Sequence, residues 1–383
     1  MQALHMIFVE NKYADKVVEK VLKQNRKWGA RDRKFIAETT YDIVRWYRLL
    51  QALSNTDAHD FWTLMGTQLI VKHGSIPPWE EFKKIDREKI FARKKEISER
   101  KIKHSIPDWL DALGEKELGA RWEVELSALN EEAPVVLRAN TLKTTRDDLQ
   151  QILLEEKVET ETIEGFPDVL IIKERQNVFR LQSFQEGLFE VQDAASQLIA
   201  PFLQVEPGMR VIDACAGAGG KTLHLASLMK NKGRLLALDV EQWKLDELKK
   251  RARRAGVSNL ETRLIDTSKV IKRLEGQADR LLLDVPCSGL GVLKRNPDAK
   301  WKLSEKFIDE VIELQQKILQ DYSGMLKPGG KMVYATCSVL PSEDEEQVKK
   351  LMEEKNNFEL EEEKRVWPSE GFDGFYVARL LAL

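Results

Sequence analysis

The second half of the sequence alternates apolar, strand-like runs with amphipathic, helix-like stretches from about residue 192 to the end. The strand-like runs are RVIDACAG, RLLALDV, LETRLID, DRLLLDVP, KMVYATC and, last, FYVARLLAL. Helical patterns such as KTLHLASLM and QWKLDELKKRARRAG separate them. This alternation predicts an α/β fold in which a parallel sheet is covered by helices on both faces. Ligands of such sheets bind beyond the carboxyl ends of the strands, so functional residues are expected there.

Two different patterns precede this region. Residues 1–128 carry apolar side chains at three- and four-residue spacing, as in ADKVVEKVLKQ, and this spacing predicts an all-helical N-terminal domain. Residues 129–191 combine the strand-like runs VVLRANTL and DVLIIK with one helical stretch, which predicts a small α+β module. Residues 192–383 then form the α/β domain.

Composition excludes several classes of protein. The 383 residues carry a formal net charge of -2, and no stretch approaches the roughly 20 apolar residues of a membrane span. The five histidines have no ligand-like spacing, so no metal is expected. The three cysteines include no CxxC pair and make no disulfide framework, and the N-terminus lacks a secretory signal. We expect a monomeric cytoplasmic protein.

A glycine-rich turn, DACAGAGGKT at residues 213–222, follows the first strand of the α/β region and opens a helix. A phosphate-binding loop requires a glycine where Cys215 stands, and the dinucleotide fingerprint requires one where Thr222 stands. A turn without a ligand is a third interpretation. Asp239 ends the next strand, about twenty residues after the turn. A carboxylate at this spacing along the sequence can accept both hydroxyls of a ribose, which favours a nucleoside ligand.

Two further aspartates end later strands of the same region. Asp266 is placed to bind an adenine amino group, and Asp284 ends the fourth strand, three residues before a cysteine. For each aspartate taken alone, a structural turn or a helix cap explains the residue equally well. It is less probable that several successive strands end in a glycine-rich turn or an aspartate by coincidence. We therefore expect the turn and the three aspartates to contact the ligand.

All three cysteines, Cys215, Cys287 and Cys337, also stand at strand ends. Beside a nucleoside cofactor, a thiol suits hydride transfer through attack on an aldehyde, or methyl transfer to carbon 5 of a pyrimidine. The second reaction requires a nucleophile, because carbon 5 reacts only after a thiolate has added to carbon 6. Asp284 is placed to stabilise the charge that develops on ring nitrogen 3. A small buried hydrophobe is the alternative role for each cysteine.

A basic segment, LKRNPDAKWK, follows Cys287. Its cations and its tryptophan suit contacts with RNA phosphates and bases. A solvated surface loop is the alternative, because lysine and arginine are usually exposed. The residues expected to contact RNA are Lys294, Arg295, Lys300 and Lys302.

Four stretches, DACAGAGGKT, LLLDVPCSGLGVLKRNPDAKW, VYATCSVLPSEDEEQV and FEVQDAASQ, resemble motifs of the RsmB/Nop/Sun family of RNA (cytosine-5)-methyltransferases. The resemblance covers about residues 130–383 and leans toward RsmB-like enzymes of 16S rRNA, so rRNA is expected as substrate before tRNA. It implies a Rossmann-like class I methyltransferase sheet in residues 192–383 and an RRM-like subdomain in residues 129–191. For residues 1–128 it suggests a NusB-like RNA-binding extension.

The resemblance also assigns roles to individual residues. It implies that Cys337 is the nucleophile and that Cys287 is a second thiol that assists release of the methylated RNA. S-adenosylmethionine is the implied cofactor. One departure is that the family commonly has Ala-Pro where this chain has Gly217-Ala218. The residues that the resemblance assigns to the cofactor are Cys215, Ala216, Gly217, Ala218, Gly219, Gly220, Lys221, Asp239, Asp266 and Asp284.

Three alternatives remain at this point. In DNA methyltransferases that make the same product, the cysteine of the PC motif is the nucleophile, which would reverse the roles of Cys287 and Cys337. A dinucleotide-dependent oxidoreductase is a second alternative, weakened by the missing third glycine. A non-catalytic RNA-binding assembly factor on a methyltransferase fold is the third. The two intact cysteines argue against that last interpretation.

Overall fold

The computed structural model describes residues 1–25 and 27–383, and these residues form two compact units. One unit consists of residues 1–132 and 292–307, and the other of residues 133–291 and 308–383. The chain therefore leaves the second unit after residue 291, contributes a short segment to the first, and returns.

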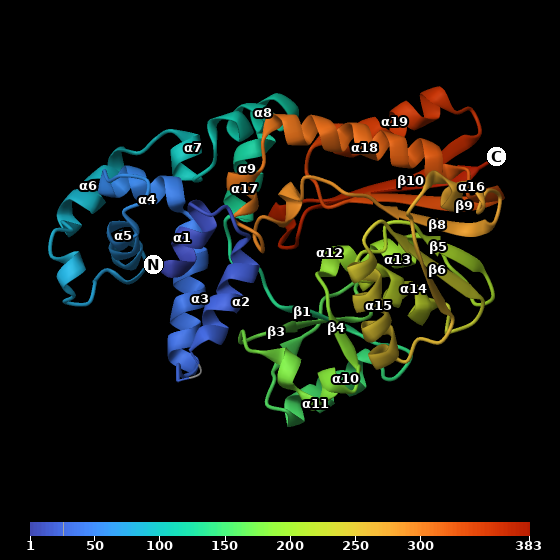
Figure 1. Ribbon diagram of the computed structural model, residues 1–383, viewed down its shortest axis with the longest axis horizontal. Coiled ribbons are helices and arrows are strands. Elements are labelled where there is room, and N and C mark those ends of the chain that lie inside the picture. The colour runs from blue at the N-terminus through green and yellow to red at the C-terminus, as the bar shows by residue number, and fades with distance from the viewer. Residues whose placement is uncertain (26) are drawn as a thin grey trace. The chain divides into compact units, whose positions relative to one another are not determined.

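The first unit is helical, as its apolar spacing predicts (Figure 1). Its core joins Leu4 and Ile7 to Val17, Ile43 and Leu64, and the half-buried Trp301 packs against the same core. The unit therefore includes the basic segment in its packing. Its helices are α1 (Gln2–Phe8), α2 (Ala14–Gln24), α3 (Ala30–Arg45), α4 (Tyr47–Ser54), α5 (Phe61–His73), α6 (Arg87–Glu96), α7 (Arg100–Lys103), α8 (Asp108–Leu118), α9 (Arg121–Leu129) and α17 (Ala299–Lys302).

The second unit begins with a small antiparallel sheet in the order β2-β3-β1-β4. Apolar side chains on one face of this sheet, including Leu137, Leu170 and Phe189, pack with Leu149 and Leu153 of α10. This arrangement confirms the small α+β module predicted from the sequence. Its elements are β1 (Val136–Ala139), α10 (Arg146–Glu155), β2 (Thr160–Glu161), β3 (Val169–Ile172), α11 (Gln182–Gln185) and β4 (Phe189–Val191).

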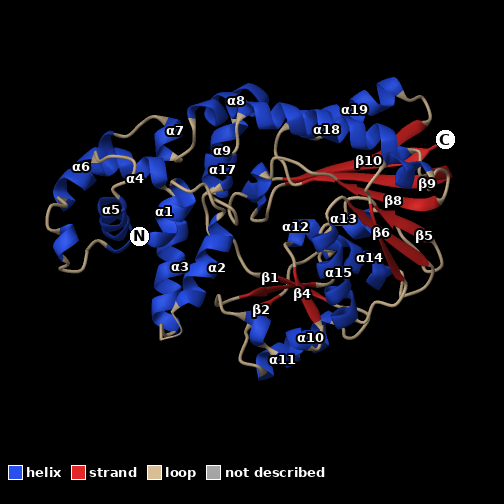
Figure 2. Cartoon of the chain, in the orientation of Figure 1, coloured by secondary structure: helices blue, strands red, loops and turns tan. Residues whose placement is uncertain are grey.

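The second unit also contains a larger sheet of seven strands, in the order β10-β11-β9-β8-β5-β6-β7 (Figure 2). Strands β5 to β9 are parallel, which confirms the predicted Rossmann-like sheet. The last strand, β11, is antiparallel and lies between β9 and β10. The strands are β5 (Arg210–Asp213), β6 (Arg234–Asp239), β7 (Leu260–Leu264), β8 (Ala278–Asp284), β9 (Leu326–Thr336), β10 (Phe358–Val366) and β11 (Phe375–Ala382).

Alternate side chains of the central strands enter two different cores, because successive residues of a strand point to opposite faces. Leu236 and Leu238 of β6 pack with Ile318 of α18, whereas Ala237 packs with Leu245 and Leu248 of α15. Helices therefore cover both faces. They are α12 (Ala194–Gln197), α13 (Ile199–Phe202), α14 (Gly220–Leu228), α15 (Gln242–Ala255), α16 (Ser268–Lys272), α18 (Glu305–Ser323) and α19 (Glu345–Glu354).

Short 3₁₀ helices occupy Glu80–Phe82, Val178–Arg180, Leu290–Val292, Pro341–Glu343 and Pro368–Glu370. Within residues 1–25 and 27–383, no helix is long and apolar enough to cross a membrane.

Candidate active site

The carboxyl ends of the parallel strands bring the predicted residues to one edge of the large sheet. Strand β5 ends at Asp213, β6 at Asp239 and β8 at Asp284, and Cys337 directly follows β9. Because these strands are parallel neighbours, their ends lie side by side. The described part of the second unit therefore holds a candidate site at this edge.

The glycine-rich turn between β5 and α14 is fixed by neighbouring strands. The amide of Ala216 donates to the carbonyl of Leu238 at 2.9 Å, and the amide of Gly217 donates to Oδ2 of Asp239, also at 2.9 Å. Oδ1 of Asp239 accepts the amide of Glu241 at 2.8 Å. Asp239 therefore shapes the turn, and its contact with a ligand stays a prediction.

The two glycines with positive φ in this turn have different roles. Gly217 has φ 55°, and a Cβ built on it would meet no atom within 4 Å, so its backbone faces open space. Gly219 has φ 89°, and a Cβ there would lie 2.0 Å from Cδ1 of Leu248 in α15. The positive φ and the packing against α15 both require a glycine at this position, and contact of Gly219 with the cofactor stays a prediction.

Cys287 and Cys337 face each other, and both are free thiols. Their sulfurs lie 3.1 Å apart, and the amide of Cys337 donates to Sγ of Cys287 at 3.3 Å. The hydrogen bond with Cys337 and burial together raise the pKa of the Cys287 thiol well above its usual value. Cys287 is therefore held as a neutral thiol beside Cys337.

Glu343 holds both cysteine loops, and sequence reasoning missed it. Each cysteine is followed by a serine, and the hydroxyls of Ser288 and Ser338 both donate to Oε1 of Glu343, at 2.5 and 2.6 Å. Oε2 accepts the amide of Ser288 at 2.7 Å and the side-chain amide of Gln315 at 3.0 Å. Glu343 is fully buried. The repeated Cys-Ser pair was the available signal in the sequence.

Lys221 and Asp284 form an ion pair at the same edge, with Nζ and Oδ2 2.6 Å apart. Burial opposes the charge of Lys221, but the charge of Asp284 and its hydrogen bond outweigh burial and raise the pKa of the lysine. Lys221, predicted as a cofactor residue, is thus held by Asp284 at this edge.

Two other predicted residues are placed differently. Asp266 lies two residues beyond the end of β7 and is exposed. Cys215 stays at the turn, where burial and then the charges of Asp213, Asp284 and Asp239 raise the pKa of its thiol well above the usual value. A thiol held neutral in this way is a poor nucleophile.

The structure corrects the prediction that the basic segment contacts RNA. Lys294 and Lys300 are 3% and 2% exposed, and Nζ of Lys300 donates to the carbonyl of Arg45 at 2.8 Å and to Oδ1 of Asn130 at 3.2 Å. Nζ of Lys302 lies 3.4 Å from the carbonyl of Ile7, and its side chain is 8% exposed. These ammonium groups are buried inside the first unit, so they do not face RNA phosphates.

Arg295 is the one predicted RNA contact in this segment that remains partly exposed, and its role stays a prediction.

A family model described as 16S rRNA methyltransferase RsmB/F matches residues 200–381, and a model of the RsmF/B-like ferredoxin-like domain matches residues 106–179. Ribosomal RNA small subunit methyltransferase B of Klebsiella pneumoniae is 33% identical over 304 residues, covering 75% of this chain and 68% of that protein. The chain belongs to the RsmB/F methyltransferase family. This membership confirms the resemblance and argues against the oxidoreductase.

Other comparisons agree with the RsmB/F assignment. The probable ribosomal RNA small subunit methyltransferase B of Synechocystis sp. is 36% identical over 261 residues, which is 67% of this chain. The match spans 58% of the length of that relative. The solved structure of the protein PH0851 is 25% identical, with a TM-score of 0.84 over 99% of this chain and 97% of that one.

Membership in the RsmB/F family confirms S-adenosylmethionine as the cofactor expected from the sequence. The turn fits this molecule, because a Cβ on Gly217 or Gly220 would meet open space, so the backbone there is accessible to a ligand. Asp239 is 7% exposed, and its carboxylate has about four lone-pair positions, of which two are taken by backbone amides. Capacity for the ribose hydroxyls remains.

Proposed function

We propose that this chain methylates carbon 5 of a cytosine in RNA, with ribosomal RNA of the small subunit as the first substrate to test. Cys337 is the nucleophile, Cys287 assists release, and Asp284 acts on ring nitrogen 3. The observation that carries the proposal is the 3.1 Å separation of the two sulfurs at the edge that also holds the cofactor turn. Methyl transfer to a nitrogen or a ribose hydroxyl needs no such pair of thiols.

The first step activates the base. Sγ of Cys337, as a thiolate, forms a bond to carbon 6, and the electron pair of the 5,6 double bond moves toward carbon 5 and nitrogen 3. Nζ of Lys221 and Oδ2 of Asp284 lie 2.6 Å apart, and a proton from this pair neutralises nitrogen 3. Carbon 5 thereby becomes nucleophilic enough to attack a methyl group.

S-adenosylmethionine, when bound, supplies that methyl group on a sulfonium. A base then removes the proton from carbon 5, the 5,6 double bond re-forms, and the bond from carbon 6 to Cys337 breaks with its electron pair on sulfur. Nitrogen 3 returns its proton to the pair of Lys221 and Asp284, which restores the neutral base. The neutral thiol of Cys287 donates a hydrogen bond to that leaving sulfur and stabilises it as it departs.

Methyl transfer from labelled S-adenosylmethionine to small-subunit rRNA, followed by bisulfite sequencing, tests the proposal. Wild-type protein is expected to protect one cytosine from conversion, and Cys337→Ala to protect none. Methylation of tRNA but not of rRNA would change the substrate, whereas binding of RNA without any methylation would favour an assembly factor. Monomeric state, cytoplasmic location and a NusB-like RNA-binding role for the helical unit stay predictions.

A further inference from the structure

Strands β1 and β4 of the small sheet offer no free face for bases, although the fold is of a kind that often binds RNA. Leu137 and Phe189 face the module's own helix α10. Arg138 and Glu190, the next residues along β1 and β4, point to the opposite face and are only 2% and 3% exposed. RNA-reading sheets of this kind stack bases on exposed aromatic side chains. At β1 and β4 both faces are buried.

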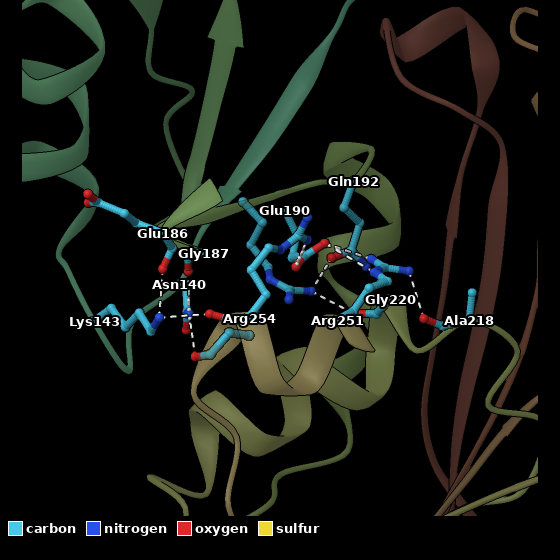
Figure 3. A network of polar contacts seen from close by, with 12 residues as sticks. Asn140, Lys143, Glu186, Gly187, Glu190, Gln192, Ala218, Gly220, Arg251 and Arg254 are labelled. Carbon is cyan, nitrogen blue, oxygen red and sulfur yellow. Dashed lines mark hydrogen bonds and ion pairs between the residues drawn. The ribbon is translucent and has the colours of Figure 1, made fainter. Parts of the chain in front are cut away.

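The buried polar residues of the second face reach the cofactor turn (Figure 3). Nη1 of Arg138 donates to the carbonyl of Gly220 at 2.7 Å. Oε2 of Glu190 accepts Nη2 of Arg251 at 2.8 Å and its Nε at 3.3 Å, and Oε1 accepts Arg254. The remaining arm of Arg251, Nη1, donates to the carbonyl of Ala218 at 2.7 Å.

These contacts fix the orientation of two peptide groups in the turn. In a trans peptide the carbonyl and the following amide point in opposite directions. Holding the carbonyl of Gly220 therefore sets the direction of the Lys221 amide, which lies in the first turn of α14 and has no acceptor within that helix. Holding the carbonyl of Ala218 sets the amide of Gly219, which donates to Ala216 at 2.9 Å.

We infer that the small module braces the cofactor turn, with Arg138, Glu190 and Arg251 as positioning residues that set affinity for S-adenosylmethionine. The inference rests on the proposed function, because it assumes that this turn binds the cofactor. Glu190 orients Arg251 through two hydrogen bonds, and the pair is nearly buried, with side chains 4% and 21% exposed. The module contributes to cofactor binding without touching the cofactor.

Calorimetric titration of the full chain with S-adenosylmethionine tests this inference, and Arg254→Gln provides a matched control. Arg254 pairs with the same carboxylate and is equally exposed, at 20%, but in the described part of the chain its side chain donates to Glu190 and not to the turn. Losing a charge-assisted hydrogen bond that shapes the site should weaken cofactor binding about tenfold in Arg251→Gln. We expect less than about a twofold change in Arg254→Gln, because this variant also loses an ion pair with Glu190 but no contact with the turn.

Thermal unfolding of both variants and RNA affinity complete the test. Similar unfolding midpoints with different cofactor affinities support the brace, and Arg251→Lys should restore part of the affinity. Equal losses of cofactor affinity in both variants, or none in Arg251→Gln, would overturn it. A fall in RNA affinity with intact cofactor binding would assign the module to RNA instead. If wild-type protein bound no S-adenosylmethionine, the proposed function itself would fail.

Discussion

The thiol loops and the glycine-rich turn stand at the same edge of one sheet but are held by groups of opposite charge. A buried carboxylate, Glu343, accepts hydrogen bonds from the serines that follow both cysteines. Guanidinium groups of Arg138 and Arg251 instead donate to carbonyls of the turn. The thiol loops present hydroxyl and amide donors, whereas the outer side of the turn presents carbonyl acceptors. Each loop is thus oriented by a partner that satisfies its exposed backbone or side-chain groups.

The largest effect is expected from Glu343→Ala. Removing the carboxylate leaves two hydroxyls, one backbone amide and the Gln315 amide without their acceptor. We expect a loss of about 3 kcal/mol in the free energy of unfolding, because hydrogen bonds to a charged group are worth about 1.5–3 kcal/mol each and water replaces some of them. Methyl transfer should fall at least about 100-fold, because misplacing reacting groups by about 1 Å has that cost.

Denaturant unfolding and methyl transfer, both compared with Glu345→Ala, measure this effect. Glu345 is 45% exposed and pairs with Arg365, so its loss should cost less than about 1 kcal/mol. Full activity in a folded Glu343→Ala protein would show that the thiols need no such anchor.

Alanine substitutions at the two glycines of the turn should separate packing from ligand access. Gly219→Ala combines a left-handed φ with a Cβ 2.0 Å from Leu248, so we expect a destabilisation of about 2–3 kcal/mol. Gly217→Ala should cost only about 1 kcal/mol, because its φ of 55° is the sole penalty.

A double-mutant cycle with Leu248→Ala checks the reason for the difference. The cost of Gly219→Ala should shrink in that background, and the cost of Gly217→Ala should not. Equal costs at the two glycines in wild-type background would remove the distinction between them.

A smaller effect is expected from the pH dependence of Asp213, which lies directly before the turn. Burial raises the pKa of this carboxyl to about 7, while its hydrogen bond with the Thr222 hydroxyl acts in the opposite direction. Because the folded-state pKa lies above the unfolded value, the folded state binds the extra proton. The contribution of Asp213 to stability is therefore complete below about pH 4 and is lost as pH rises through about 7.

Asp213→Asn should abolish that loss. Its free energy of unfolding, relative to wild type, is expected to rise by about 1–2 kcal/mol between pH 4 and pH 8, since relaxation reduces the cost of the buried charge. Denaturant titrations at both pH values measure the difference. A constant gap between the two proteins across this range would mean that Asp213 ionises normally.

Much of the sheet and its edge could be predicted because the information is local. Strand β6 carries the apolar run LLAL between Arg234 and Asp239, as expected for a strand buried on both faces. The same reasoning located Asp284, Cys287 and Cys337. Asp239 and the glycines were found because a turn between a strand and a helix requires particular residue types.

The groups that hold these residues could not be recognised, because burial is decided by distant parts of the chain. Glu343 lies in PSEDEEQV, which looks like an exposed acidic surface. Arg251 lies in the basic run KKRARRAG. Its neighbour Lys250 has a side chain that is 69% exposed, whereas Arg251 donates to the turn, and the sequence does not distinguish the two residues. Lys300 was predicted to contact RNA, and only the packing of the helical unit around it reveals that its ammonium is buried.

The central claim, that Cys337 attacks and Cys287 releases, is tested most directly by the single mutant that traps RNA. Cys287→Ala and Cys337→Ala are incubated with small-subunit rRNA and S-adenosylmethionine and separated on a denaturing gel. Cys287→Ala should accumulate a covalent protein–RNA adduct, because the bond to carbon 6 still forms but its release is slowed. Cys337→Ala should form none while still binding cofactor. An adduct in Cys337→Ala and none in Cys287→Ala would contradict the account and make Cys287 the nucleophile.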